Sequence, residues 1–351
     1  MIPIDVKRRL LDLHQIRSVQ PMPPGNSGAV LFRCQGDQAF ALRGWPIETA
    51  VERVREIHQV ISTAARSCTL LPQYASLPPD GPTYLVDRQG RIWELASWLP
   101  GQPFPYDATF EQIADGAAAI ATVHRHLQPI GQSQRPAAAI DQRIRRTRQL
   151  SDLLPTLFDI NLEGRLNPLV AGEVSTAREL LRRNWHTSAQ RILETLLPQA
   201  SRPRGLHYVL RDIHREHALV VGGRISGIID FDALRVDTPA ADLSRWATSF
   251  SVFSQDSART IDCVLAGYFG IQPLEQKPAS AIVTDFPPAD TNVFGPDFRT
   301  LVETLATSSL WISLANWVVW LVIESRQFPD FQSVALRLRR LIDAAQRSTE
   351  R

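Results

Sequence analysis

The residues best suited to chemistry lie in two short segments between positions 210 and 231. The first is 210–217 (LRDIHREH) and the second is 227–231 (GIIDF). Phosphoryl transfer needs one carboxylate that orients the attacking hydroxyl and accepts its proton, and further ligands for the magnesium that neutralises phosphate charge. An acid at the start of a polar loop and a second acid at the end of an apolar run suit these tasks. We therefore expect Asp212 to orient the hydroxyl, and His217 with Asp230 to hold the metal.

The elements around these residues explain how they would meet. Two apolar, β-like runs, 218–221 and 225–229, are joined by Gly222 and Gly223, which favours a tight hairpin. This hairpin would bring Asp212 and Asp230 together at the floor of a cleft between two lobes.

Chain length and periodicity predict those lobes. A chain of 351 residues exceeds the size at which single cores stop growing, about 250–300 residues. Residues 1–100 show helical spacing at 4–16 and 47–65 and strand signals at 29–34, 38–42, 83–87 and 91–97. Residues 101–351 are mostly helical, with helices expected at 110–127, 140–154, 172–197 and several beyond 240. The fold class is therefore α+β, with a small antiparallel lobe before a larger helical lobe.

Composition narrows the function classes. The formal charge of +2 gives no long-range field toward nucleic acid or membrane. Three widely spaced cysteines favour neither a disulfide framework nor a zinc site, so we expect a cytoplasmic protein. The apolar stretch 310–323 is too short to span a bilayer and predicts a buried core helix. The arginines of the helical lobe lack interleaved aromatic residues, which predicts solvated helix faces rather than a nucleic-acid groove. These arginines are Arg143, Arg145, Arg146, Arg148, Arg182 and Arg183.

The two chemical segments resemble the catalytic block of aminoglycoside phosphotransferases and their choline-kinase relatives. That block reads His-Gly-Asp, four residues, Asn, an apolar strand, a glycine turn, and Ile-Asp-Phe or Ile-Asp-Trp. The following segment, 236–245 (VDTPAADLSR), is similar to the family's Gly-Asp-Pro element and Asp-Leu-Ala-Arg helix. The resemblance implies a protein-kinase-like fold, ATP or GTP with Mg²⁺ as cofactors, and transfer of the γ-phosphate to a hydroxyl of a small molecule.

The resemblance also assigns residues of the small lobe to nucleotide binding. It implies a glycine turn over the phosphates, a strand residue that grips phosphate, an acidic partner for that residue, and hinge backbone that pairs with adenine. The glycine turn is formed by Gly25, Asn26, Ser27 and Gly28, and the strand residue is Arg43. The acidic partner is Glu56, and the hinge residues are Ser97 and Leu99. Asp242 and Arg245 are expected to be structural, with the Asp242 carboxylate accepting backbone amides of the catalytic loop.

The chain departs from the family pattern at three positions. Leu210 replaces the first histidine, His217 replaces the asparagine, and Arg43 replaces the strand lysine; Lys7 and Lys277 are the only lysines. Magnesium prefers oxygen to imidazole nitrogen. Two alternatives to an active kinase therefore stay open. One is a catalytically impaired pseudokinase that binds nucleotide or metabolite without transfer, and the other is an RNA-binding helical protein.

Overall fold

The computed structural model describes residues 2–23, 28–77, 81–251, 256–270 and 297–349, which form two compact units. Unit 1 comprises Met1–Phe104, Thr122–Ile130 and Glu216–Leu234. Unit 2 comprises Pro105–Ala121, Gly131–Arg215 and Arg235–Arg351. Unit 1 therefore takes in two segments that come later in the chain than residue 100.

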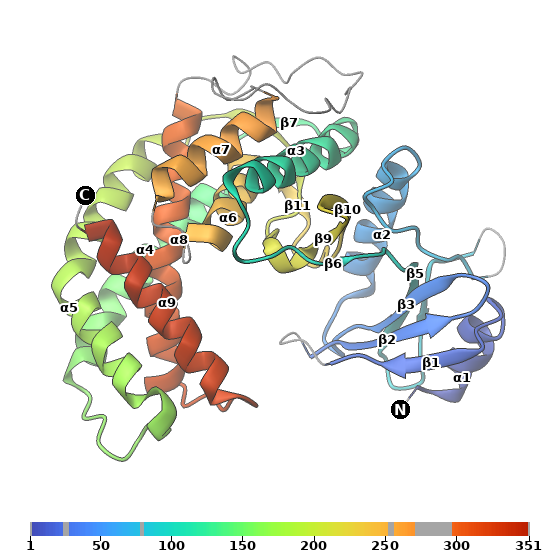
Figure 1. The fold of residues 1–351 in the computed structure, drawn as a ribbon, viewed down its shortest axis with the longest axis horizontal. Helices are drawn as coiled ribbons and strands as arrows, with labels where there is room; N and C mark the ends of the chain where they lie inside the picture. Colours follow the sequence, from blue (N-terminus) through green and yellow to red (C-terminus); the bar gives the residue numbers. More distant parts are fainter. Residues whose placement is uncertain (1, 24–27, 78–80, 252–255, 271–296, 350–351) are drawn as a thin grey trace. The chain divides into compact units, whose positions relative to one another are not determined.

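Unit 1 is built on a five-stranded antiparallel sheet in the order β1-β2-β3-β5-β4 (Figure 1). Its strands are β1 (Ser18–Pro21), β2 (Val30–Gln35), β3 (Ala39–Gly44), β4 (Tyr84–Val86) and β5 (Ile92–Ser97). Strands β2 and β3, which correspond to the strand signals at 29–34 and 38–42, form a hairpin in which Gln35 pairs with Ala39. Apolar side chains of β2, β3 and β5, such as Cys34, Leu42 and Leu95, are fully buried and form the core of this unit.

One long helix, α2 (Val51–Ala65), belongs to unit 1 (Figure 1). Val54, Ile57 and Ile61 recur at helical spacing and are fully buried. The helix begins at Val51 rather than at the predicted residue 47, because Pro46–Thr49 closes a turn and Ala50 is extended.

The N-terminal helix is shorter than the predicted span 4–16. It consists of α1 (Ile4–Val6) and a π-helical turn (Lys7–Leu11). Gln15 has a φ of 52°, a left-handed conformation that ends helical continuation before β1.

A second sheet in unit 1 has the order β10-β9-β6. Its strands are β6 (Gln102–Pro103), β9 (Ala218–Val221) and β10 (Arg224–Ile228). The predicted hairpin is therefore present, and its register shifts between Ile225 and Gly227.

Unit 2 combines a small antiparallel sheet, in the order β11-β8-β7, with helices. The strands are β7 (Ser133–Arg135), β8 (Arg204–Val209) and β11 (Arg235–Asp237). The helices are α3 (Phe110–Leu127, whose last turns belong to unit 1), α4 (Ala138–Asp159), α5 (Pro168–Leu196), α6 (Ala240–Ser251), α7 (Ser257–Phe269), α8 (Asp297–Val322) and α9 (Phe331–Thr349). Single 3-10 turns occur at Gln128–Ile130, Leu197–Gln199 and Arg215–His217.

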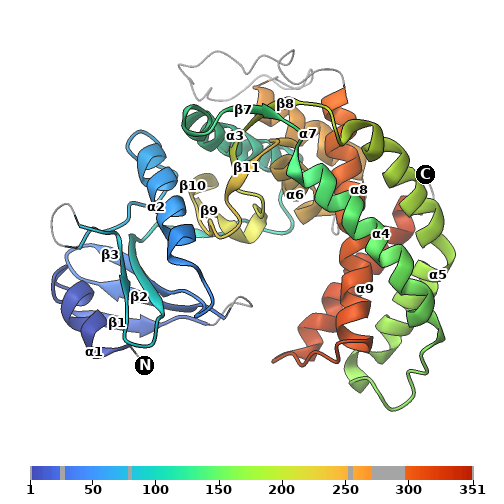
Figure 2. The ribbon, with the colours of Figure 1, turned by 180° about the vertical axis from the view of Figure 1, so that it is seen from behind.

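Helix α8 is the centre of the unit 2 core. It packs against α4, α5, α6 and α9, as Figure 2 shows for α4, α5 and α9. Within the described chain it is the one helix long and apolar enough to cross a membrane, with a mean hydropathy of 1.5 in its most apolar window. The expectation that this stretch is too short to span a bilayer is therefore wrong, because the helix has 26 residues. Since 78% of that window is buried, α8 serves as a core helix, as predicted.

The architecture confirms the predicted α+β class. A mostly antiparallel β unit with one long helix precedes a unit dominated by helices.

Candidate active site

Asp242 on α6 anchors the loop that carries Asp212. Its carboxylate accepts hydrogen bonds from the backbone N–H groups of Leu210, at 2.7 Å, and Arg211, at 2.6 Å. Asp242 is fully buried, and Arg211 has a φ of 68°, which is uncommon for a residue with a side chain. The expected role of Asp242 is confirmed, and the loop conformation is held by the hydrogen bonds that satisfy its amides.

Asp212 is held by Arg245, one turn further along α6. The Arg245 Nε donates to Asp212 Oδ1 at 2.9 Å. The Asp212 side chain is 48% exposed, so its carboxylate remains accessible while its direction is set by the guanidinium. Arg245 was expected to be structural, and in the structure it positions the predicted catalytic acid.

Arg211 fixes the other side of this loop. Its guanidinium forms an ion pair with the buried carboxylate of Asp237 and a hydrogen bond to Gln142. Asp237 also accepts the backbone N–H of Thr238 at 2.8 Å and that of Ala139 at 3.2 Å. Burial raises the pKa of Asp237, and the positive charge of Arg211 opposes that rise. The loop is therefore tied to β11 and α4 as well as to α6.

In unit 1 the β9–β10 hairpin brings His217 and Asp230 together. The His217 Nε2 lies 3.4 Å from Asp230 Oδ2, and the Ile229 N–H donates to the His217 carbonyl at 2.9 Å. Asp230 has a φ of 66° and a side chain that is 40% exposed. Two ligands of one small divalent cation lie roughly 3 Å apart, given metal–oxygen distances near 2.1 Å. The two side chains therefore fit a shared cation, although a nitrogen and an oxygen donor suit magnesium less well than two oxygens.

The carboxylate that pairs with Arg43 is Asp232. Both terminal nitrogens of the Arg43 guanidinium donate to the two Asp232 oxygens, one at 2.6 Å. Burial lowers the pKa of Arg43, but the hydrogen bond and charge of Asp232 outweigh this, so the pKa is raised overall. The expected partner, Glu56, instead binds Arg53 at 2.7 Å. The prediction of a helix carboxylate for Arg43 is wrong because a residue 189 positions away comes closer.

Arg53 connects α2 to the same segment. One of its guanidinium nitrogens donates to the backbone carbonyls of Asp232, at 2.9 Å, and Leu234. Helix α2 therefore holds the chain just after Asp230 and Phe231 through an arginine rather than through an acid.

A buried polar network lies beside Arg43 and was not predicted from the sequence. Glu94, on the neighbouring strand opposite Arg43, accepts from His58 Nε2 at 2.7 Å and from the Trp45 indole at 2.5 Å. The Trp45 ring lies 4.2 Å from the Arg43 guanidinium carbon. The clue available in the sequence is an acid inside an apolar strand, since Glu94 is only 4% exposed and buried acids need partners.

The remaining nucleotide-binding predictions concern the glycine turn and the hinge. Gly25, Asn26 and Ser27 lie outside the described residues, whereas Gly28 has a φ of +77°, as a glycine turn requires. The Ser97 N–H donates to the Gln73 carbonyl at 2.8 Å, so this amide is not available to adenine. Leu99 follows the end of β5, and its side chain packs closely against Gly227.

Comparison with solved structures defines the class. A structure of an aminoglycoside phosphotransferase from Alicyclobacillus acidocaldarius aligns with a TM-score of 0.62 at 14% identity, covering 100% of this chain and 94% of that chain. An amicoumacin kinase in complex with AMP-PNP, Ca²⁺ and Ami aligns with a TM-score of 0.58 at 10% identity, covering 97% and 96%. A spectinomycin phosphotransferase in complex with ADP and spectinomycin aligns with a TM-score of 0.57 at 12% identity, covering 96% and 95%. The fold is thus that of the protein-kinase-like antibiotic kinases.

The family follows from the sequence itself. The model of the phosphotransferase enzyme family matches residues 18–278, and the chain belongs to this family. It is a divergent member and a small-molecule phosphotransferase. A search of the curated proteins finds no match.

Proposed function

We propose that this enzyme transfers the γ-phosphate of ATP or GTP to a hydroxyl group of a small molecule. The observation that carries the proposal is the position of Asp212. Its carboxylate is half-exposed, lies on a loop held by two hydrogen bonds to Asp242, and is oriented by Arg245. A pre-oriented carboxylate of this kind is the group that phosphoryl transfer to an alcohol requires.

Asp212 interacts with the acceptor hydroxyl. It accepts a hydrogen bond from the attacking hydroxyl and takes its proton as the new oxygen–phosphorus bond forms. The bond between the γ-phosphorus and the β–γ bridging oxygen breaks in the same step, and ADP or GDP leaves. The Arg245 guanidinium engages one carboxylate oxygen and so fixes the direction of the Asp212 side chain.

Asp230 and His217 are the residues that would hold Mg²⁺. The metal supplies charge neutralisation at the phosphate oxygens when it is bound. Asp230 contributes the oxygen ligand that magnesium prefers. Asp232 keeps its own carboxylate engaged with Arg43 and does not compete as a ligand in this arrangement.

Arg43 is the candidate phosphate contact in unit 1. A guanidinium carries five N–H donors, and two are used by Asp232, so three remain for phosphate oxygens. Gly25, Asn26, Ser27 and Gly28, with the Leu99 backbone, complete the proposed nucleotide site. Nucleotides in solved relatives support this part of the proposal, since the amicoumacin kinase holds AMP-PNP and the spectinomycin phosphotransferase holds ADP.

Two substitutions separate binding from transfer. We expect Asp230→Ala to weaken nucleotide binding in the presence of Mg²⁺ at least tenfold, because it removes the oxygen ligand of the metal. We expect Asp212→Asn to leave nucleotide binding within about twofold and to lower phosphate transfer by 100-fold or more, as loss of a positioned general base does. Calorimetric titration measures the binding, and consumption of labelled nucleotide with a panel of hydroxyl compounds measures the transfer.

Asp256→Asn is the matched control, because Asp256 caps α7 on the surface of unit 2. It should change neither quantity. Unchanged nucleotide binding in Asp230→Ala would count against the proposed metal site. Metal-dependent nucleotide binding by the wild type, without transfer to any acceptor, would instead support the pseudokinase alternative.

A further inference from the structure

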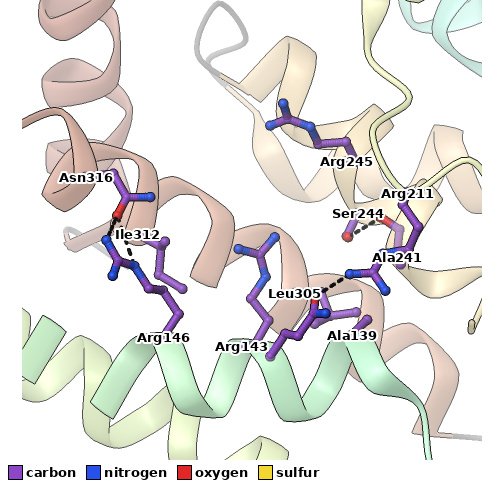
Figure 3. A pocket seen from close by; sticks show the side chains of 11 residues that line it. Ala139, Arg143, Arg146, Arg211, Ala241, Ser244, Arg245, Leu305, Ile312 and Asn316 are labelled. Atoms are coloured by element: carbon purple, nitrogen blue, oxygen red, sulfur yellow. Dashed lines mark hydrogen bonds between the residues drawn. The ribbon is translucent and has the colours of Figure 1, made fainter. Parts of the chain in front are cut away.

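Unit 2 contains a pocket of about 350 Å³ between α4, α6 and α8, beside the loop that carries Asp212 (Figure 3). A volume of this size accommodates a small metabolite. Arg143 and Arg146 of α4 lie on one face, because positions three and four apart share a helix face. Figure 3 shows the Arg143 side chain between Arg146 on one side and Arg211 on the other. The expectation of solvated helix faces is wrong for Arg143 and Arg146, which line this pocket together with Arg211 and Arg245.

The four arginines are not equally neutralised. Arg211 is paired with Asp237, and Arg245 is paired with Asp212. Arg143 donates to the hydroxyl of Ser309 at 2.5 Å, and Arg146 donates from Nε to the Asn316 side-chain oxygen at 3.1 Å. Within the described part of the chain, Arg143 and Arg146 therefore have neutral partners and no carboxylate, which leaves two positive charges in the pocket wall.

The charge of Arg143 is also poorly solvated. Burial, together with the smaller effects of the positive charges of Arg245 and Arg211, lowers the pKa of Arg143 to about 10. A group with this pKa is still protonated at neutral pH, so the protein retains a partly buried cation that has no carboxylate partner among the described residues. An anion in the pocket would remove this cost, because guanidinium groups bind carboxylate and phosphate oxygens through paired hydrogen bonds.

We propose that this pocket binds the anionic group of the acceptor, so that the acceptor is a hydroxy compound carrying a carboxylate or a phosphate. This inference rests on the proposed function and specifies its substrate class. Arg245 links the two parts, since this residue lines the pocket and its guanidinium contacts Asp212. An acceptor held by Arg143 and Arg146 thus has its hydroxyl beside the catalytic carboxylate.

The same charge distribution argues against a polycationic acceptor. Two unneutralised guanidinium groups repel ammonium groups at short range, and the low dielectric of a half-buried pocket strengthens that repulsion.

The test is a binding measurement without nucleotide, so that it does not depend on phosphate transfer. Glycerol 3-phosphate and D-glycerate serve as anionic probes, glycerol is the neutral control and spectinomycin the cationic control. We expect saturable calorimetric binding of at least one anionic probe, competed by inorganic phosphate, and at least tenfold weaker binding of both controls.

Variants of α4 localise that binding. Arg143→Gln and Arg146→Gln should each weaken the binding of the anionic probe at least fivefold. Arg143→Lys keeps the positive charge and should retain more of the binding affinity than Arg143→Gln. Arg148→Gln is the matched control, because Arg148 is an exposed arginine on the same helix and should bind as the wild type does. Thermal unfolding of each variant verifies that it is folded.

The proposal is overturned if neither anionic probe binds, if glycerol or spectinomycin binds as tightly, or if Arg148→Gln weakens binding as much as Arg143→Gln. Anion binding that persists while nucleotide binding and transfer are absent would leave this inference standing and contradict the proposed function. The two hypotheses therefore fail separately.

Discussion

Arg43 shows how one substitution changes the charges around the proposed phosphate contact. A lysine ammonium is a point charge, whereas a guanidinium binds a carboxylate through two parallel hydrogen bonds. In this chain Arg43 uses that geometry on Asp232, and Trp45 covers the guanidinium face. The helix acid Glu56 forms an ion pair with Arg53 instead. Because the ion pair is partly buried, its loss should affect folding as well as nucleotide binding.

A double-mutant cycle of Arg43→Met and Asp232→Asn measures this ion pair. We expect each single substitution to lower the free energy of unfolding by about 1–3 kcal/mol, less than a fully buried pair loses, because Asp232 retains 32% exposure. The double substitution should cost less than the sum of the two, which gives a coupling energy of about 1 kcal/mol. Urea unfolding provides the measurement.

The control cycle is Arg17→Met with Asp37→Asn. That pair is 72% and 69% exposed and should show no measurable coupling. Strict additivity of the Arg43 and Asp232 substitutions would show that the pair does not stabilise unit 1.

At the scale of elements, α6 is fixed against α3 by one close contact. Trp246 is fully buried, and its indole N–H donates to the Ile113 carbonyl at 3.0 Å. Gly116 on α3 leaves the space for this ring, since a Cβ at that position would lie 2.1 Å from Trp246 Cζ2. Because α6 also carries Asp242 and Arg245, this contact supports the loop that holds Asp212.

Alanine substitutions at two helix glycines test this packing. Gly116→Ala should lower the free energy of unfolding by about 2–3 kcal/mol, because the buried indole must move. Gly172→Ala, on α5 where a Cβ meets no atom within 4 Å, should raise it by about 0.5–1 kcal/mol, since alanine favours a helix over glycine. Equal effects of the two substitutions in urea unfolding would contradict the proposed role of Gly116.

At the scale of the whole molecule, each of the two units contains a hydrophobic core. The unit 1 core includes Cys34 and Trp93, and the unit 2 core is formed by α4, α5, α8 and α9. Two cores agree with a chain longer than one core normally supports. Each unit contains at least one cysteine, so the solvent accessibility of the two units can be measured separately by thiol alkylation. Cys34 and Cys68 lie in unit 1, and Cys263 lies in unit 2.

Alkylation of these thiols checks the burial of the unit 1 core. Burial raises the pKa of Cys34 to about 11, opposed by a backbone hydrogen bond from Leu42, so very little thiolate exists at pH 8. We expect iodoacetamide to modify Cys34 at least 100-fold more slowly in the native protein than in urea, as measured by peptide mass spectrometry. Cys263, which is only partly buried, should react faster and is the internal control.

The same pKa shift has a definite sign for stability. Because the pKa of Cys34 is higher in the folded state, the neutral thiol contributes fully below pH 9.0, and the contribution is lost as the pH rises toward about 11. The free-energy cost of Cys34→Ala should therefore be larger at pH 7 than at pH 11. A cost independent of pH, or native alkylation at the unfolded rate, would contradict the burial of this thiol.

The local spacing of residues was sufficient to predict the bounds of several helices and strands. Helix α3 has the predicted bounds Phe110–Leu127, and strand β9 has the predicted bounds Ala218–Val221. The periodicity of apolar residues and the pairing of glycines are patterns that extend over only a few residues, so they can be recognised in the sequence alone. The anchoring of the catalytic loop by Asp242 was also predictable, because an acid in the first turn of a helix readily accepts backbone N–H groups.

What the sequence determined by itself is therefore the family, the α+β class and the order of the chemical residues Asp212, His217 and Asp230. The tertiary structure alone decided which charges meet: Asp232 with Arg43, Arg245 with Asp212, and Arg143 with no acid among the described residues. The physical reason is that ion pairing depends on distance in space, and residues 189 positions apart show no local pattern that reveals their contact.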